Sequence, residues 1–128
     1  MTREVLAIDL KDDEAVRIYR DHHRRVWPEV LDSLHNFGVV DMHIYLAGRR
    51  LVMIVETKDG CDLRAAFDAR IASHPRVAEW EALMKSMQQP APGSADGEWW
   101  AVMQPVFDLY RDESAAETDT RPGSARRA

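Results

Sequence analysis

Two residue types suited to acid–base chemistry lie one helical turn apart in this sequence. Tyr19 and His23 are spaced by four in a segment whose pattern predicts a helix, so they share one helix face. An imidazole titrates near neutral pH and can both give and take a proton, while a nearby phenol can orient a hydroxyl. The adjacent His22 points about 100° away around the helix. Such a pair is more often a packing or surface feature, so both interpretations stay open.

A tryptophan and a glutamate form a second candidate pair. Trp80 has the helical spacing of a core residue relative to Val77, Met84 and Met87. A tryptophan also offers a wide apolar face with one N–H donor, which suits stacking against a bound molecule. Glu81 follows directly and can accept a hydroxyl hydrogen bond, although a solvated helix position is the simpler interpretation.

Motifs for metal ions and nucleotide cofactors do not occur in the sequence. There is no HExxH or CxxC motif, and His22 and His23 are adjacent rather than one turn apart. There is no glycine-rich phosphate loop, and no serine lies in a nucleophile elbow. The sequence therefore predicts a site with no metal and no cofactor.

The elements that must position these residues follow from hydrophobic periodicity and from Pro and Gly positions. Pro28 disfavours helical geometry at Trp27 and should kink or restart the first helix. The predicted order is strand, helix, strand, strand, helix and strand, with strands at 1–10, 39–46, 51–56 and 99–109 and helices between them. This order predicts an α+β, ferredoxin-like βαββαβ antiparallel sheet with helices on one face.

The second predicted strand has two different faces. Asp41, His43 and Tyr45 alternate with apolar residues, so the face away from the helices is polar and aromatic. Such a face can line a pocket or a dimer interface. By the same alternation, at most one of the consecutive Trp99 and Trp100 can enter a given pocket.

Composition narrows the class of protein. The formal net charge of −5 argues against a nucleic-acid partner, and no apolar run approaches the length of a membrane span. A single cysteine, Cys61, excludes an internal disulfide and suits a reducing, cytoplasmic compartment. Residues 1–110 have the pattern of one domain, and the polar, aperiodic residues 111–128 predict a disordered tail.

Beyond these local patterns, the chain resembles a known family. Residues 19–30, YRDHHRRVWPEV, resemble the Y-x-x-x-H…W-P-E motif of the L-rhamnose mutarotase family. Residues 38–45 are similar to that family's second strand, and residues 80–84 and 100–109 also fit its pattern. The resemblance covers about residues 3–110.

The resemblance implies a dimeric α/β-barrel assembly, with the pocket on the open face of the sheet and a monosaccharide as substrate. It implies that His23 is the catalytic proton donor and that Tyr19 and Trp80 bind substrate. The rhamnose branch has a tyrosine where this chain has Met42, and a second tryptophan where this chain has Glu81. These departures favour L-fucose over L-rhamnose. Asp41, Met42, Tyr45 and Glu81 complete the expected binding residues.

The implied reaction is interconversion of the α and β anomers of a 6-deoxy-L-hexose. A base removes the anomeric hydroxyl proton while an acid protonates the ring oxygen, and the open-chain aldehyde recloses from either face. Two alternatives stay open, because fold alone does not decide function. One is a dimeric ferredoxin-like monooxygenase, and the other is a non-catalytic module that binds a small ligand.

Overall fold

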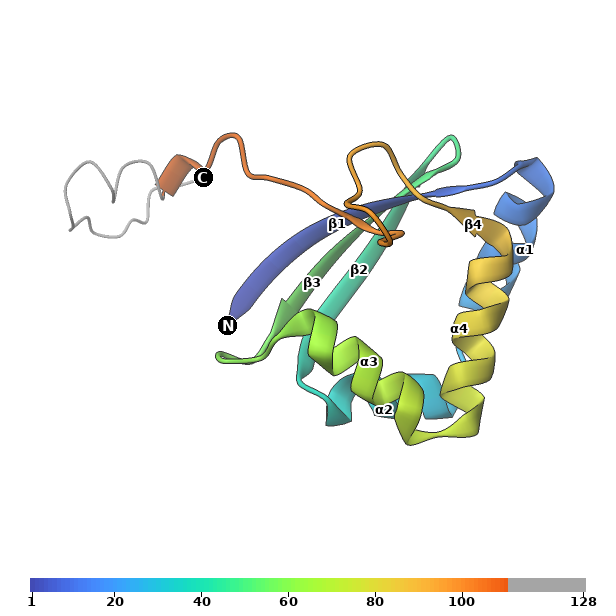
Figure 1. Cartoon of the computed structure of the whole chain (residues 1–128), viewed down its shortest axis with the longest axis horizontal. Helices are drawn as coiled ribbons and strands as arrows, with labels where there is room; N and C mark the ends of the chain where they lie inside the picture. The colour runs from blue at the N-terminus through green and yellow to red at the C-terminus, as the bar shows by residue number, and fades with distance from the viewer. Residues whose placement is uncertain (111–128) are drawn as a thin grey trace.

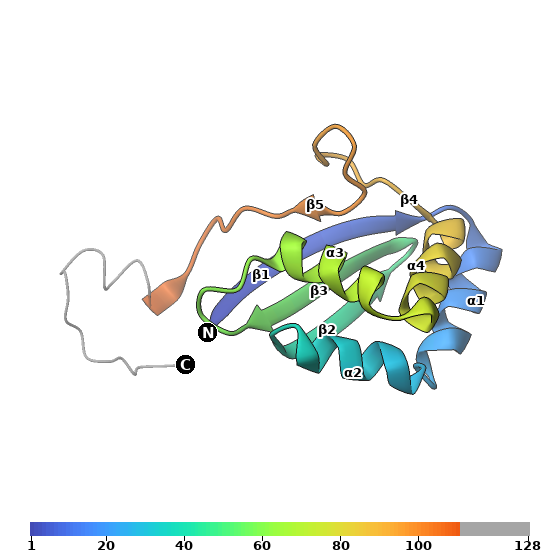
Figure 2. The ribbon, with the colours of Figure 1, turned by 60° about the horizontal axis from the view of Figure 1, so that its bottom comes forward.

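The computed structural model describes residues 1–110, which form an antiparallel sheet with helices on one side (Figure 1). Figure 2 shows the same helices lying together over one face of the sheet. The elements in chain order are β1 (Thr2–Leu10), α1 (Asp13–His23), α2 (Pro28–Asn36), β2 (Val39–Ala47), β3 (Arg50–Thr57), α3 (Leu63–Ser73), α4 (Pro75–Met87), β4 (Gln88–Gln89) and β5 (Ala101–Val102).

The strand order confirms the predicted ferredoxin-like topology. The sheet runs β2-β3-β1-β4, and β5 also pairs with β1. β1 and β3 pair in antiparallel register, with Leu6 opposite Met53, and β2 and β3 form the predicted hairpin. Gly48, with φ of 62°, supplies the left-handed conformation that this tight turn needs. The expected tail, residues 111–128, lies outside the described residues.

The prediction of one long final strand over residues 99–109 is wrong. Two short pieces, β4 and β5, pair with different parts of β1 instead. The intervening loop begins at Pro90 and is closed by a hydrogen bond from the Ala91 N–H to the Trp99 carbonyl oxygen. Beyond β5, Met103 still donates to Val5, but Pro105 has no N–H to continue the ladder.

The helix breaks occur where the prolines predicted them. α1 ends at His23, and Trp27 has an extended conformation (φ −61°, ψ 138°) before Pro28 begins α2. His74, also extended, ends α3, and its Nδ1 accepts a hydrogen bond from the N–H of Arg76 in the first turn of α4. These breaks let consecutive helices turn back across the sheet.

Alternation along the strands divides the sheet into two faces. The helix-covered face carries the buried apolar residues, among them Leu6, Ile8, Leu10, Met53 and Val55. The opposite face carries the exposed polar and aromatic residues of β2, and no helix of the described chain covers it. The expected homodimer stays a prediction.

Asp12 starts α1 by capping it, and its removal gives a measurable loss of stability. The Asp12 carboxylate accepts a 2.7 Å hydrogen bond from the N–H of Ala15, a donor that has no partner within the helix. We expect Asp12→Ala to lower the free energy of unfolding by about 1 kcal/mol in urea denaturation. Asp12→Asn keeps an acceptor and should cost much less. Equal losses in both variants would contradict the capping role.

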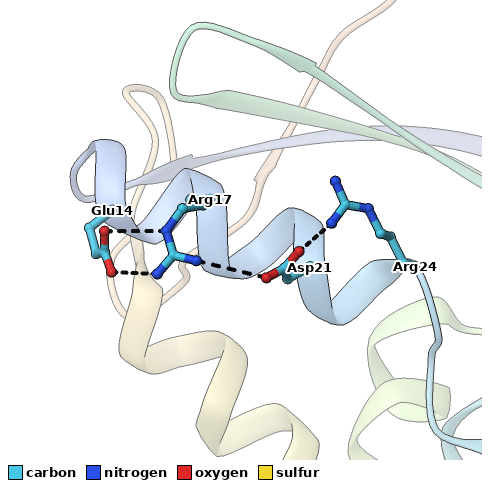
Figure 3. Close-up of polar contacts among 4 residues, drawn as sticks. All are labelled: Glu14, Arg17, Asp21 and Arg24. Atoms are coloured by element: carbon cyan, nitrogen blue, oxygen red, sulfur yellow. Dashed lines mark hydrogen bonds and ion pairs between the residues drawn. The ribbon is translucent and has the colours of Figure 1, made fainter.

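The outer face of α1 is a chain of ion pairs (Figure 3). Arg17 pairs with Glu14 at 2.7 Å and with Asp21 at 3.8 Å, and Arg24 pairs with Asp21. Arg24 lies just beyond the last residue of α1 and is exposed, so its ion pair joins the end of the helix to the outer face. Within residues 1–110, each helix is too short or too polar to cross a membrane.

Candidate active site

A cavity of about 800 Å³ lies between the helices and the sheet. This volume is within the range of small-molecule binding sites. Side chains from all four helices and from the helix-covered face of the sheet line it, including Tyr19, His23, Val30, Met42, Ile44, Met53, Arg70, Trp80, Glu81 and Trp100. The expectation of a pocket on the open face of the sheet is therefore wrong.

The orientation of His23 follows from one hydrogen bond. Its Nδ1 donates to the backbone carbonyl oxygen of Tyr19, 2.8 Å away, since a carbonyl can only accept. In the neutral ring, Nε2 is then the atom with a free lone pair, and no residue in 1–110 bonds to it. Burial lowers the pKa of His23, and the hydrogen bond to Tyr19 opposes this only in part. The ring is therefore a neutral base with its acceptor nitrogen available to a ligand.

His23 is held among aromatic rings. It stacks on Tyr19 with centroids 4.1 Å apart and meets the edge of Trp80 at 5.3 Å. Trp27 also contacts Trp80 edge to face, with the ring centroids 5.1 Å apart. Trp80 is 4% exposed, belongs to the core and also lines the cavity, so its core position is confirmed and its stacking role stays a prediction. These contacts restrict the imidazole to one position.

Tyr19 is suited to donating a hydrogen bond and not to accepting a proton. Its side chain is 5% exposed and lines the cavity. Burial raises the pKa of the Tyr19 phenol well above its usual value, and the negative charge of Glu81 adds to this. The phenol therefore keeps its proton throughout the neutral range.

The remaining predicted residues border the cavity from β2 and α4. Met42 lies on the helix-covered face of β2, packed against the core. Asp41 and Tyr45 reach the cavity margin at this edge strand, but they alternate with Met42 and are mostly exposed. Asp41 pairs with His43 at 3.1 Å, outside the cavity. Glu81 lines the wall near Tyr19 and is one-third exposed.

The cavity is also lined by residues outside the predicted site, among them Arg70 and Trp100. Arg70 on α3 lines the cavity although it is 3% exposed, and Trp100 enters from the loop before β5 while Trp99 does not. The expectation that only one of the two tryptophans enters is thus confirmed. Arg70 has the helical spacing of a buried residue relative to Leu63 and Ala66. This spacing is the feature of the sequence from which its burial could have been predicted.

The lowered pKa of His23 predicts that stability depends on pH. Below about pH 6.5 the unfolded chain binds a proton at His23 that the folded chain resists binding. The free energy of unfolding should therefore fall as the pH drops through this value, and level off once the folded pKa is passed. Urea denaturation of the wild type and of His23→Gln between about pH 5 and 8 should show their difference growing with pH. Parallel curves would contradict the shift.

Known proteins resemble this chain in sequence and in fold. A family model described as L-rhamnose mutarotase matches residues 3–109. An L-fucose mutarotase of Xanthomonas campestris pv. campestris is 42% identical over 112 residues, covering 85% of this chain and 89% of the relative. An L-rhamnose mutarotase of Jannaschia sp. is 34% identical over 95 residues, covering 71% of this chain and 83% of the relative. The crystal structure of an L-rhamnose mutarotase from Formosa agariphila shares the fold, with a TM-score of 0.62 at 18% identity, covering 85% of this chain and 99% of that chain.

Proposed function

The chain belongs to the L-rhamnose mutarotase family, and from this membership we propose that it interconverts the α and β anomers of a 6-deoxy-L-hexose in the cavity described above. The observation that carries the proposal is the state of His23. Its Nδ1 is committed to a backbone carbonyl, which leaves Nε2 as a neutral base inside a cavity walled by aromatic rings.

In the proposed reaction, Nε2 of His23 removes the proton from the anomeric hydroxyl. The bond between C1 and the ring oxygen breaks, and the ring oxygen takes a proton from an acid in the site. The product is the open-chain aldehyde. Rotation about the C1–C2 bond presents the other carbonyl face, and the reverse proton transfers close the ring. His23 returns to its starting state, so no net proton is gained or lost.

Tyr19 and Trp80 would hold the sugar in this reaction. The Tyr19 phenol, which keeps its proton, donates a hydrogen bond to a sugar oxygen. The indole of Trp80 packs against the apolar C–H face of the ring. Asp41 and Tyr45 at the margin would complete the binding site, although their exposure makes their contribution smaller.

L-Fucose is the favoured substrate. The relative from Xanthomonas, at 42% identity, is described as an L-fucose mutarotase. The residues of this chain at Met42 and Glu81 also differ from the aromatic residues of the rhamnose branch. A carboxylate accepts hydrogen bonds from hydroxyls, which an indole in its place cannot do.

Saturation-transfer NMR tests the proposal directly. One anomeric proton of equilibrated L-fucose, then of L-rhamnose, is irradiated while the signal of the other anomer is followed with increasing protein. We expect protein-dependent transfer with both sugars and faster transfer with L-fucose. Absence of transfer with either sugar across neutral pH would refute the mutarotase. Binding without transfer would indicate a ligand-binding module, and oxygen consumption with a quinol would indicate a monooxygenase.

A further inference from the structure

Arg70 is a positive charge placed in the interior of the protein. Its side chain on α3 is 3% exposed, yet it lines the cavity. A buried charge is costly to stability unless it is paired and fully hydrogen-bonded. The cost points to a role at the cavity.

Two contacts fix the guanidinium. Its Nε donates to Oγ of Ser33 at 3.0 Å, and Nη1 lies 3.5 Å from Oε2 of Glu81. Ser33 is itself buried and uses its own proton to bond the carbonyl oxygen of Val30 at 2.7 Å, so its lone pair faces Arg70. The Phe67 ring lies 5.1 Å below the guanidinium carbon. The head group is therefore oriented from α2, α3 and α4 together.

These contacts leave donors unused. A guanidinium has five N–H groups, and only Nε and one N–H of Nη1 have partners among residues 1–110. The other carboxylate oxygen of Glu81, Oε1, likewise has no hydrogen-bond partner in the described structure. The cavity wall thus presents an unused donor beside an unused acceptor.

We propose, on the basis of the mutarotase function proposed above, that Arg70 is a specificity-determining residue that acts together with Glu81. The free Nη2 of Arg70 donates to one hydroxyl of the bound hexose, and Oε1 of Glu81 accepts from the neighbouring hydroxyl. A sugar hydroxyl can donate and accept, so two adjacent hydroxyls match a donor and an acceptor held side by side. Ser33 is a positioning residue, because it acts only through Arg70.

This arrangement can distinguish sugars that differ only in configuration. L-Fucose and L-rhamnose differ at C2 and C4, so a donor–acceptor pair in a fixed position meets a different set of hydroxyls in each. A buried polar group that loses its ligand partner discriminates strongly, whereas apolar contacts with the common C6 methyl do not. The rhamnose branch has a tryptophan in place of Glu81, and this difference agrees with a role of Glu81 in the choice between the two sugars.

The test compares Glu81→Leu, which removes both carboxylate oxygens, and Arg70→Lys with the wild type on L-fucose and L-rhamnose. Exchange rates from saturation transfer are measured against sugar concentration, which separates KM from kcat. We expect each variant to raise the KM of the preferred sugar at least about tenfold, and the ratio of kcat/KM between the two sugars to approach one. The pH profile, which reports His23, should not move.

Glu79→Leu is the matched control. Glu79 lies on the same helix, is exposed and, within residues 1–110, pairs only with Arg76, so this variant should keep the selectivity of the wild type. A wild type with no exchange on either sugar would refute the mutarotase function and not the pairing of Arg70 with a ligand. An active wild type whose Glu81→Leu variant keeps its KM and selectivity would overturn the joint role of Arg70 and Glu81. If Arg70→Lys does not fold, Glu81→Leu decides, because Glu81 is one-third exposed and its replacement leaves the buried contact between Arg70 and Ser33 in place.

Discussion

Replacing His23 with glutamine is expected to lower the rate of anomer exchange by about 10²–10⁴-fold while the protein stays folded. Glutamine is uncharged and close to histidine in size, so it can occupy the space of the imidazole beside Tyr19 and Trp80. It has no group that takes up a proton near neutral pH. The loss should therefore appear in kcat, with a smaller change in KM. Saturation-transfer NMR measures both.

His22→Gln is the matched control for this variant. His22 is the neighbouring residue on α1, but it does not line the cavity and meets Trp80 only at its edge, 6.1 Å between centroids. Its replacement should keep the exchange rate within about twofold of the wild type. Full activity in His23→Gln, or equal losses in both variants, would exclude His23 as the acid–base group.

Replacing Trp80 with alanine should give the largest loss of stability. Its indole is 4% exposed and contacts Trp27 and His23 within a core cluster that includes Ile8 and Leu10. Removing a buried aromatic ring costs about 3–5 kcal/mol, because the transfer free energy is lost and a void remains. Urea denaturation followed by circular dichroism should show this as a lower midpoint with an unchanged slope.

Two further variants show whether the loss comes from the ring itself. Trp80→Phe keeps an aromatic side chain and should lose less stability, while sugar binding weakens because the stacking face is smaller. Trp99→Ala removes a tryptophan that is partly exposed and outside the cavity, so its cost should be clearly lower. A loss below about 1 kcal/mol in Trp80→Ala would show that neighbouring residues collapse into the space.

The two residues with the largest expected effects, His23 and Trp80, are in contact with each other. Trp80 belongs to the core and also restricts the imidazole of His23. A catalytic side chain is held more precisely when its neighbours are locked by packing than when it lies on a loop. Stability and acid–base geometry therefore depend on the same ring, and Trp80→Ala should lose activity even in the molecules that remain folded.

Most of the fold could be predicted from the sequence. The period of two in β1 and β2 and the prolines at positions 28 and 75 gave the correct order of strands and helices. The final strand was predicted wrongly. Alternation of apolar residues indicates which segment can form a strand, but it does not show which of its residues find a hydrogen-bonding partner in the sheet. The pairing of this segment with β1 is interrupted at residues 90–100 by a loop and stops near Pro105, which has no N–H to donate.

The sequence by itself determined the local part of the candidate site. Tyr19 and His23 come together because a helix brings residues four apart onto one face, and the hydrogen bond from His23 to the Tyr19 carbonyl lies within the same helical turn. The tertiary structure decided the rest. Arg70 meets Ser33 and Glu81 only where three helices converge, and no local period encodes such a meeting. The tertiary structure also decided which side of the sheet holds the cavity, because that depends on how the helices pack over the strands.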